Sequence, residues 1–380
     1  MIYLDNAATT SLSSKAMDTL IKISQENFGN PSSIHSFGRK ASQTLRQARQ
    51  EIAIALHAKP NQIIFTSGGS EADTLAIQGY ALAHQHQGKH LITTAIEHHA
   101  VLHTMEYLEK RFGFDITYLT PVNQKITVQQ VKEALRPDTV LVSAMFANNE
   151  TGDLLPIKEI GDLLQEHQAV FHVDAVQAIG KVPIHPEELG IDFLSASGHK
   201  FHGPKGVGFL YSKLASFDSL IHGGKQEDKH RAGTENIASI AAMATALTEQ
   251  LKQADDHYQV VHQLKEKFLE GLSGIDFYIN ESTDTLPYVL NIGFPNQLNE
   301  QLLMRLDLAG IAVSSGSACT AGAIENSHVL TAYYGADSPR LKESIRISFS
   351  EENTIQEIET VTETIKEIIG GAHLWHLKQK

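Results

Sequence analysis

The stretch that decides the fold is Phe193-Leu194-Ser195-Ala196-Ser197-Gly198-His199-Lys200, which is followed closely by Gly203-Pro204-Lys205-Gly206. Its apolar first half predicts a strand and the glycines and proline after it predict a loop, so Lys200 is expected where the strand ends. Upstream, the apolar run 169–171 leads into His172-Val173-Asp174, which places an acid at the carboxyl end of a second strand. Because ligand sites of open α/β sheets gather at the carboxyl ends of strands, we expect Lys200 and Asp174 to face one cleft.

A lysine and an acid in one cleft have a specific chemical use. A lysine amine can condense with an aldehyde, and an acid can hold a pyridine nitrogen protonated, which together are the minimum for pyridoxal phosphate chemistry. The alternative, which this pair alone leaves open, is a solvated lysine beside an ordinary turn.

Composition restricts the classes of function. The chain has 380 residues, 42% of them apolar, which is enough for two domains or for one large domain with a smaller one attached. Its 44 acidic and 31 basic residues give a net charge of -13 without a Lys/Arg block, which disfavours direct contact with nucleic acid or anionic membranes. The first residues do not resemble a secretory signal, and the longest weakly polar run, 237–247, is too short to span a bilayer. A single cysteine, Cys319, excludes an intrachain disulfide, so we expect a cytoplasmic protein.

The first two thirds of the chain alternate between strand and helix patterns. Apolar strands are expected at 63–66, 91–96, 116–119 and 140–145, and helical segments lie between them. This alternation predicts an α/β fold in which a mostly parallel sheet is covered by helices on both faces.

The strand at 63–66 runs into Ser67-Gly68-Gly69-Ser70-Glu71 and then into a helix. Free backbone N–H groups and the positive end of the helix dipole make such a turn suitable for a phosphate. The alternative is an ordinary strand-to-helix turn with Ser70 as the N-cap.

Beyond Gly223 the pattern changes to that of a smaller α+β domain. Residues 237–272 predict one long helix that connects two bodies, followed by strands at 277–279, 289–292 and 345–348 and helices near 298–308 and 353–369. We place the boundary near residue 255, which gives a large domain of residues 13–255 and a small domain of residues 1–12 and 256–380.

Nine short motifs, in order along the whole chain, carry a family resemblance. They are Asp5-Asn6-Ala7-Ala8-Thr9-Thr10, Phe28-Gly29-Asn30-Pro31-Ser32-Ser33, Phe65-Thr66-Ser67-Gly68-Gly69-Ser70-Glu71, Glu97-His98-His99-Ala100, Asn148-Asn149-Glu150, His172-Val173-Asp174, Ser197-Gly198-His199-Lys200, Arg231-Ala232-Gly233-Thr234 and Ser314-Ser315-Gly316-Ser317-Ala318-Cys319-Thr320. The chain resembles the cysteine desulfurases of the NifS/IscS type, which are pyridoxal phosphate enzymes of the class V aminotransferase family. The resemblance implies the aspartate-aminotransferase-like fold type I.

The resemblance also implies a role for each matching residue. Lys200 would form the Schiff base with the cofactor, Asp174 would pair with its pyridinium nitrogen, and His98 would stack on the ring and transfer protons. Gln177 and Asn149 would contact the ring oxygen. The cofactor phosphate would be held by four residues of this chain and one of a neighbouring subunit: Gly69, Ser70, Ser197 and His199, with Thr234 from across a homodimer interface.

Substrate and sulfur chemistry are expected in the carboxyl-terminal part. Arg346 is a candidate for a bidentate grip on the substrate carboxylate, with Asn149 beside it. Cys319 lies in a run of small residues, 314–322. This composition favours a mobile loop, and it argues against the alternative of a buried, inert thiol. The resemblance implies that L-cysteine becomes L-alanine, that a persulfide forms on Cys319, and that the sulfur passes to an acceptor protein for iron–sulfur cluster assembly or tRNA thiolation.

Two other functions remain open at this point: a selenocysteine lyase, and a non-catalytic scaffold for sulfur transfer. No catalytic metal is expected from the six histidines between residues 84 and 103. His98 and His99 would face opposite ways at a strand end, and no His-Glu-x-x-His or cysteine pair completes a zinc site. One departure from the family is that Lys225 and Lys229 stand where it usually has glycines, which stiffens a loop expected near the dimer interface.

Overall fold

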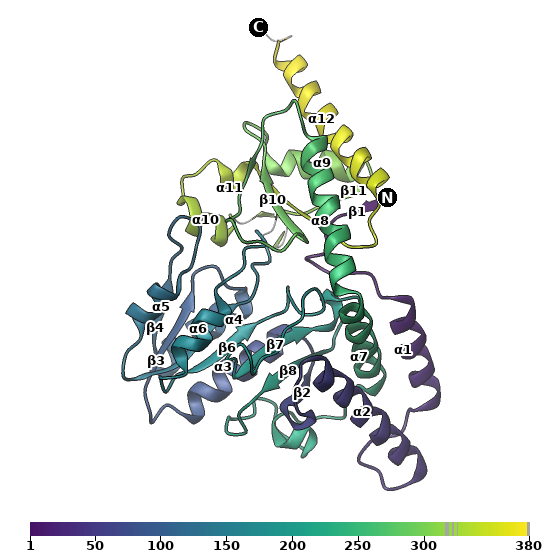
Figure 1. The fold of residues 1–380 in the computed structure, drawn as a ribbon, viewed down its shortest axis with the longest axis vertical. Coiled ribbons are helices and arrows are strands. Elements are labelled where there is room, and N and C mark those ends of the chain that lie inside the picture. The colour runs from purple at the N-terminus through teal and green to yellow at the C-terminus, as the bar shows by residue number, and fades with distance from the viewer. Residues whose placement is uncertain (316–318, 321–322, 325, 378–380) are drawn as a thin grey trace.

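The computed structural model describes residues 1–315, 319–320, 323–324 and 326–377, and the side chains within 1–315 and 326–370. Figure 1 shows a broad body built around one large sheet and a narrower body above it that contains β10, α9 and α12. Within the described part of the chain, no helix combines the length and apolar character that a bilayer crossing requires.

A seven-stranded sheet organises the broad body. Its strands follow the order β2-β8-β7-β6-β5-β3-β4, and all neighbours are parallel except where β8 meets β2 and β7. The predicted α/β fold with a mostly parallel sheet is therefore confirmed. The strands are β2 (Ile63–Thr66), β3 (His90–Thr94), β4 (Asp115–Leu119), β5 (Thr139–Met145), β6 (Val170–Asp174), β7 (Phe193–Ser197) and β8 (Gly208–Ser212).

Strand β8 is the member of this sheet that the sequence patterns did not reveal. It begins at Gly208, directly after the Gly/Pro-rich turn at 203–206, so the turn signals obscure its start. It pairs antiparallel with β7 from Ser197↔Gly208 to Phe193↔Ser212. The segment that contains Lys200 is therefore held between two paired strands, β7 before it and β8 after it.

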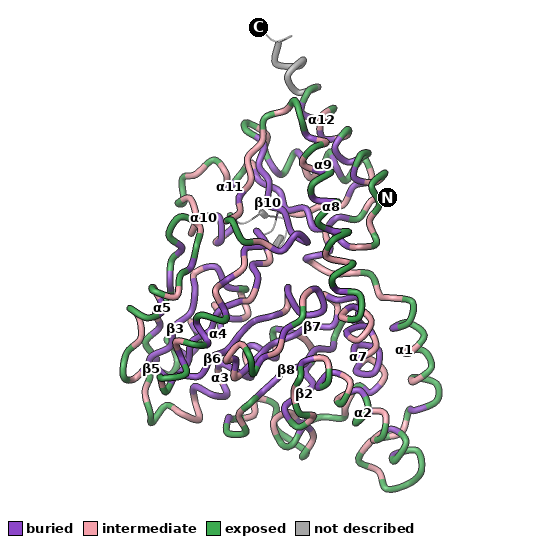
Figure 2. Tube along the Cα trace, viewed as in Figure 1, coloured by how far each residue is buried: buried purple, intermediate pink, exposed green. Residues whose placement is uncertain are grey.

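Helices cover both faces of the sheet, as the near-continuous apolar strands predict. Ile64 packs with residues of α3 (Gly69–Ala83) and α4 (His99–Phe112) on one face. Its neighbours Ile63 and Phe65 pack on the other face with α2 (Ser36–Ala55) and with α7 (Ile237–Lys252). Figure 2 shows the sheet strands buried between exposed outer helix surfaces.

The predicted long helix at 237–272 is wrong, because the structure divides it into α7 (Ile237–Lys252) and α8 (Ala254–Gly271). The break is at Gln253, whose φ of -121° and ψ of 14° are not helical. Asp255 and Asp256 follow in the first turn of α8, where acidic side chains stabilise a new helix amino terminus.

The narrower body contains an antiparallel sheet with the order β14-β10-β9. Its strands are β9 (Tyr278–Ile279), β10 (Val289–Gly293) and β14 (Ser344–Ser348), as the sequence predicted, with α9 (Asn299–Leu308) and α12 (Ile355–Leu377) packed beside them. Strand β1 (Ile2–Tyr3) pairs in parallel with β11 (Ile311–Ala312), so the amino-terminal arm joins this body. The division into domains of residues 13–255 and of residues 1–12 with 256–380 stays a prediction.

The remaining elements connect these two bodies or lie at their edges. They are α1 (Ser14–Glu26), η1 (Pro60–Gln62), α5 (Val128–Ala134), α6 (Ile157–Leu164), η2 (Gly198–Lys200), η3 (Gln226–Lys229), β12 (Cys319–Thr320), β13 (Ala323–Ile324), α10 (His328–Tyr334) and α11 (Arg340–Glu343).

Candidate active site

A cavity of about 480 Å³ lies where β6 and β7 end, between the sheet, the amino-terminal arm and β14. This volume is in the range of small-molecule sites. Ten of the residues singled out from the sequence line it, and they come from both halves of the chain: Gly69, Ser70, His98, Asn149, Asp174, Gln177, Ser197, His199, Lys200 and Arg346.

Lys200 ends the short helix η2, directly after β7. Its Nζ donates to the backbone oxygens of Ala7 and Ala8 in the amino-terminal arm, the latter at 2.9 Å. Burial, followed by the positive charge of Arg346, lowers the pKa of Lys200 to about 8. A larger fraction of this amine is therefore uncharged near neutral pH than in an exposed lysine, as nucleophilic use requires.

Asp174 ends β6 on the neighbouring strand, and its Oδ1 accepts a hydrogen bond of 2.9 Å from the Val176 N–H. Burial, followed by repulsion from the nearby Asp73 carboxylate, raises the pKa of Asp174 to about 7. A buried carboxylate whose pKa is raised by desolvation favours a positively charged ligand group beside it.

The glycine turn between β2 and α3 faces the same cavity. The helix N-cap is Gly68, whose φ of 156° and ψ of -175° are accessible essentially only to glycine. Ser70 lies in the first helical turn, so its assignment as N-cap is wrong. A second cavity of about 380 Å³ adjoins the first at Gly69, Ser70, Ser197 and His199, which are the four residues expected at the phosphate.

His98 is the N-cap of α4, with the Ala100 N–H donating to its Nδ1 over 3.1 Å. The expectation that His98 and His99 end a strand is wrong, because β3 already ends at Thr94 and His99 opens the helix. Burial, followed by the charge of Lys200, lowers the pKa of His98 to about 4, although part of the ring is open to the cavity. Since Nδ1 accepts a hydrogen bond, the neutral ring carries its proton on Nε2.

Arg346 and Asn149 meet at the cavity wall opposite the sheet. Arg346 Nη1 donates to the Asn149 backbone oxygen over 2.8 Å, and Nη2 donates to Asp5 Oδ1 over 2.9 Å. Within the described residues, the buried Nε of Arg346 and Oδ1 of Asn149 have no hydrogen-bond partner. Buried polar atoms without partners at a cavity wall are where ligand atoms are expected.

The residues around this cavity match a known family. The family model for class-V aminotransferases matches residues 2–361. This chain belongs to the class-V aminotransferase family. It is 50% identical over 373 residues to a putative cysteine desulfurase IscS 1 of Bacillus subtilis (strain 168), covering 97% of this chain and 98% of that relative. It is 44% identical over 373 residues to a cysteine desulfurase IscS of Methanosarcina thermophila, covering 97% and 92% respectively.

Solved structures agree with this class-V assignment. A NifS-like protein superposes with a TM-score of 0.91 at 34% identity, over 97% of this chain and 99% of that one. A structure described as SspA in complex with cysteine superposes with a TM-score of 0.83 at 36% identity, over 93% and 100%. The fold-type-I architecture that the motifs implied is confirmed.

Pyridoxal phosphate is the cofactor of this class-V enzyme, and the cavity fits it on the chain's own geometry. An amine of lowered pKa, a buried acid, a glycine turn at a helix start and unpartnered buried atoms face one space. These are the groups required for an aldehyde, a pyridine nitrogen, a phosphate and ring or substrate oxygens, respectively.

Sequence reasoning missed three ionisable residues at this site. Asp73 lines the cavity beside Asp174, and Asp5 holds the guanidinium of Arg346. Lys181 lies one turn after Gln177 and donates to its Oε1 over 3.3 Å, while Gln177 Nε2 donates to the Ala7 oxygen. The four-residue spacing from Gln177 to Lys181 was a signal that could have been used.

Two further site residues were predicted from the sequence, Thr234 and Cys319. Thr234 is exposed and lines neither cavity described above. Cys319 belongs to β12, which pairs with β13, but its side chain lies outside what the structure describes. The loop with the missing glycines forms η3, in which Lys229 takes a φ of 73°, a left-handed value that favours glycine.

Proposed function

We propose that this chain is a pyridoxal phosphate-dependent cysteine desulfurase, which converts L-cysteine to L-alanine and holds the released sulfur as a persulfide on Cys319. The observation that carries the proposal is that Lys200 and Asp174 face one cavity at the carboxyl ends of adjacent strands in a class-V chain. Bound pyridoxal phosphate supplies an electron sink for the electrons released at the substrate Cα.

Lys200 and His98 divide the proton transfers. The uncharged amine of Lys200 accepts the Cα proton, which its lowered pKa of about 8 allows near neutral pH. His98 holds a proton on Nε2 at the cavity because its Nδ1 is occupied by the α4 amide. It therefore serves as a neutral hydrogen-bond donor and proton relay, rather than as an imidazolium.

Arg346 binds the carboxylate of the amino-acid substrate. Its guanidinium is already oriented by Asp5 and by the Asn149 backbone oxygen, and its Nε remains available. Gln177 and Asn149 would contact the ring oxygen of the cofactor, and the orientation of the Gln177 amide is fixed by Lys181 on one side and by the arm on the other. Orienting the substrate before the reaction lowers the entropic part of the barrier.

Cys319 completes the reaction as a nucleophile. Its thiolate attacks the substrate sulfur, so an S–S bond forms as the Cβ–Sγ bond breaks, and the electron pair left on Cβ takes up a proton. Lys200 returns a proton to Cα, which gives alanine. The sulfur is passed to an acceptor protein for iron–sulfur cluster assembly or tRNA thiolation. We place this activity in the cytoplasm, where a protein with one cysteine keeps its thiol reduced.

The enzyme works as a homodimer in which Thr234 reaches the phosphate of the partner subunit. Exposed apolar side chains before α2 and in its first turn support this arrangement: Phe28, Ile34 and Phe37 are 72%, 91% and 53% exposed. Large apolar side chains clustered at a surface mark protein contacts. Analytical ultracentrifugation of the Ile34→Glu variant tests this interface. We expect the variant to shift toward monomer and to lose cofactor.

The test of the function is to measure alanine and persulfide from L-cysteine with the purified protein and with Cys319→Ser. The wild type is expected to form both products and the variant neither. Borohydride reduction followed by peptide mass spectrometry is expected to place the cofactor on Lys200. A colourless protein that takes up no cofactor would instead support a scaffold, and a much higher rate on selenocysteine would support a lyase.

A further inference from the structure

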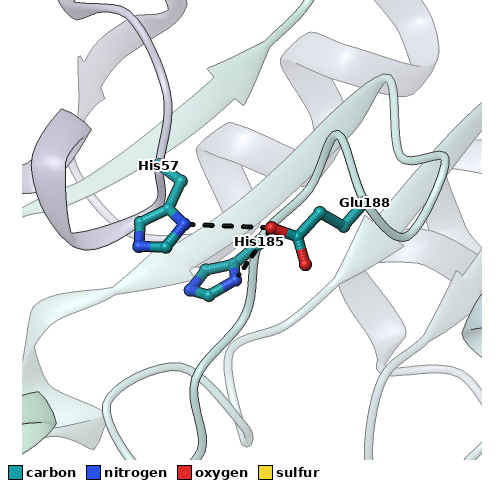
Figure 3. Close-up of side chains that lie close together, drawn as sticks. All are labelled: His57, His185 and Glu188. Atoms are coloured by element: carbon teal, nitrogen blue, oxygen red, sulfur yellow. Dashed lines mark ion pairs between the residues drawn. The ribbon is translucent and has the colours of Figure 1, made fainter.

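Three ionisable side chains meet outside the two cavities described above, and Figure 3 shows them close together. His57 follows α2, and His185 and Glu188 lie in the connection from β6 to β7. Glu188 Oε1 is 3.4 Å from His185 Nδ1 and 3.9 Å from His57 Nδ1. One donor atom of each residue lies within 4.8 Å of the others.

The cluster is assembled by two local turns. His185 and Glu188 are brought to one side by a helical turn, in which the Glu188 and Leu189 N–H groups donate to the His185 oxygen over 3.1 and 3.2 Å. His57 is presented by the end of α2, where the Ala58 N–H donates to the Ala53 oxygen over 2.8 Å. Both turns lead toward the amino ends of sheet strands, β7 and β2 respectively, opposite the edge that holds Lys200.

The backbone at His57 is strained. Its φ of 53° is left-handed, at the position after a helix where glycine is strongly favoured. A histidine there carries a conformational penalty that glycine would avoid. Strained side-chain-bearing residues of this kind are retained where the side chain has a use, and this side chain points at Glu188 and stacks on His185.

We propose that His57, His185 and Glu188 form a binding site for a divalent transition-metal ion, with Zn²⁺ as the reference ion. Imidazole nitrogens and a carboxylate oxygen are the donors that Zn²⁺ takes in three-ligand sites, where water fills the fourth position. Bonds of about 2.0–2.2 Å in a tetrahedron separate the donors by about 3.3 Å, close to the 3.4 and 3.9 Å distances to Glu188 Oε1.

Binding requires a small rearrangement of side chains. The two imidazoles are stacked, with centroids 3.6 Å apart and planes at 15°, so one ring turns about its Cβ–Cγ bond to direct both lone pairs at the ion. There is room for this turn, because the side chains of His57 and Glu188 are 62% and 70% exposed. The ion then connects the end of α2 to the segment that leads into β7, and stabilises the folded chain by mass action.

The other histidine–acid contacts in the described residues supply matched controls. His262 and Glu266 lie on the surface of α8 with Nδ1 and Oε2 3.4 Å apart, the same separation as His185 and Glu188 but with one imidazole only. Within the described part of the chain, His57, His185 and Glu188 are the three metal-ligating side chains whose donor atoms all lie within 4.8 Å of one another.

The experiment compares the cofactor-loaded wild-type protein with three variants, His57→Gly, His185→Ala and His262→Ala. Zn²⁺ binding is measured by equilibrium dialysis, and Tm is measured with Zn²⁺ and with a chelator. Because thiolates and imidazoles in general are Zn²⁺ ligands, the readout is the difference between variants. We expect His57→Gly and His185→Ala to weaken the tightest site by at least about tenfold and to abolish the rise in Tm, while His262→Ala behaves as wild type.

His57→Gly separates metal binding from simple damage to the fold. Glycine relieves the left-handed backbone, so Tm in chelator is expected to rise above that of the wild type while the response to Zn²⁺ disappears. Equal Zn²⁺ binding in wild type and His57→Gly would overturn the proposal. Loss in His57→Gly with full retention in His185→Ala would also overturn it, since a three-ligand site needs both rings.

Discussion

Lys200 and His202 lie two residues apart and occupy opposite electrostatic environments. Lys200 faces the cavity, where burial lowers its pKa to about 8, lowers the pKa of His199 to about 4 and raises the pKa of Asp174 to about 7. His202 is also buried, but hydrogen bonds and ion pairs from its carboxylate neighbours raise its pKa. The same short segment therefore serves two different purposes.

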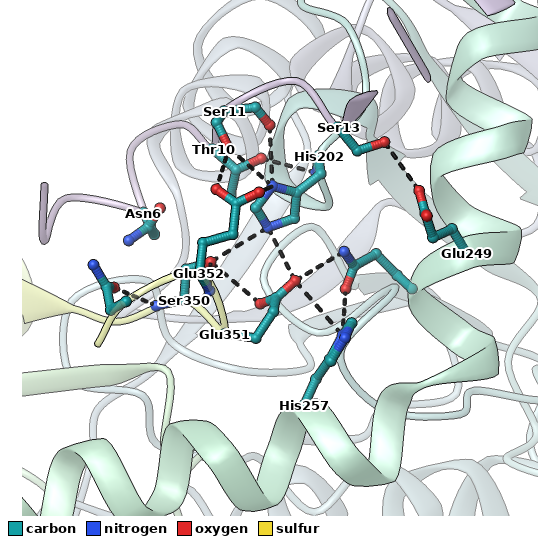
Figure 4. A network of polar contacts seen from close by, with 12 residues as sticks. Asn6, Thr10, Ser11, Ser13, His202, Glu249, His257, Ser350, Glu351 and Glu352 are labelled. Atoms are coloured by element: carbon teal, nitrogen blue, oxygen red, sulfur yellow. Dashed lines mark hydrogen bonds and ion pairs between the residues drawn. The ribbon is translucent and has the colours of Figure 1, made fainter. Parts of the chain in front are cut away.

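The surroundings of His202 form a completed network, shown in Figure 4. Its Nε2 is 3.3 Å from Glu351, and its Nδ1 donates to the Ser11 oxygen over 3.0 Å. Glu351 also accepts from Gln250 over 2.9 Å and lies 3.5 Å from His257. These contacts hold the pKa of Glu351 at about 2 despite its burial.

The difference separates a site prepared for a ligand from a finished structural joint. In the network every buried charge has a partner, and the partners come from the arm, α7, α8 and the segment after β14. In the cavity burial is the largest cause of the shifted pKa values of Asp174 and Lys200, and the buried Nε of Arg346 has no hydrogen-bond partner among the described residues. Shifted pKa values that arise mainly from burial mark a place where a charged ligand completes the set.

Substitution of Lys200 tests the cavity side of the comparison most severely. Under the proposed mechanism, Lys200→Ala removes both the amine that binds the cofactor and the base for the Cα proton. We expect alanine formation from L-cysteine to fall by on the order of 10³-fold or more, in line with the upper range for a lost acid–base group. Single-turnover assays with the cofactor added in excess measure it, and activity within tenfold of wild type would contradict the role.

Asp174→Asn is expected to have the next largest effect. It keeps the shape of the side chain but removes the charge that would hold a ring nitrogen protonated. We expect about 10²-fold lower turnover, comparable with the loss of one buried electrostatic partner. Steady-state kinetics at saturating cofactor check this value.

The same substitution should increase the stability of the cofactor-free protein, although it lowers the turnover of the loaded enzyme. Because the folded pKa of Asp174 is raised to about 7, its contribution to stability is present below the ordinary pKa near 4 and is lost as the pH rises through 7. Cofactor-free Asp174→Asn is therefore expected to be more stable than cofactor-free wild type at pH 8 and equal to it near pH 4. Denaturant titrations at both pH values test the sign, and a less stable variant at pH 8 would refute it.

Arg346→Lys should affect substrate binding more than chemistry. Lysine keeps the charge near Asp5 but cannot make the bidentate contact, so a carboxylate loses one charge-assisted hydrogen bond of about 1.5–3 kcal/mol. We expect kcat/KM for L-cysteine to fall about 10- to 100-fold, mainly through KM. An unchanged KM with reduced kcat would place Arg346 outside the substrate site.

The cavity residues that could be located from the sequence are those that lie at the end of a recognisable strand. Asp174 and Lys200 end adjacent strands, and the glycine turn follows a third, so local patterns locate them without knowledge of tertiary contacts. The pairing of Arg346 with Asp5 could not be read in this way, because the two residues are 341 positions apart.

Features that depend on a few degrees of backbone or on distant contacts were not predictable. The helix at 237–272 has one continuous helical pattern, yet Gln253 interrupts it. Histidines that are neighbours in the sequence do not reveal the His57–His185 contact, since the two residues meet through strands that share one sheet. The Glu351 network likewise draws on four separate segments.

Glu351→Gln tests the structural side of the comparison, with the smallest expected effect. Glu351 has a lowered pKa, so its contribution to stability is present above its ordinary pKa of 4.5 and is lost toward pH 2. His202 has a raised pKa, so its contribution is present below 6.5 and is lost as the pH rises through its folded pKa. The pair therefore stabilises the folded protein most between about pH 4.5 and 6.5, and the variant should lose roughly 1–3 kcal/mol of stability there and less at pH 9.

Glu352→Gln is the control, since Glu352 is exposed and 3.9 Å from His202, and it should change stability little. Urea titrations at the two pH values measure both variants. A loss that is equal at pH 5.5 and pH 9 would show that Glu351 acts through its shape, and that the charge of His202 contributes nothing to the joint.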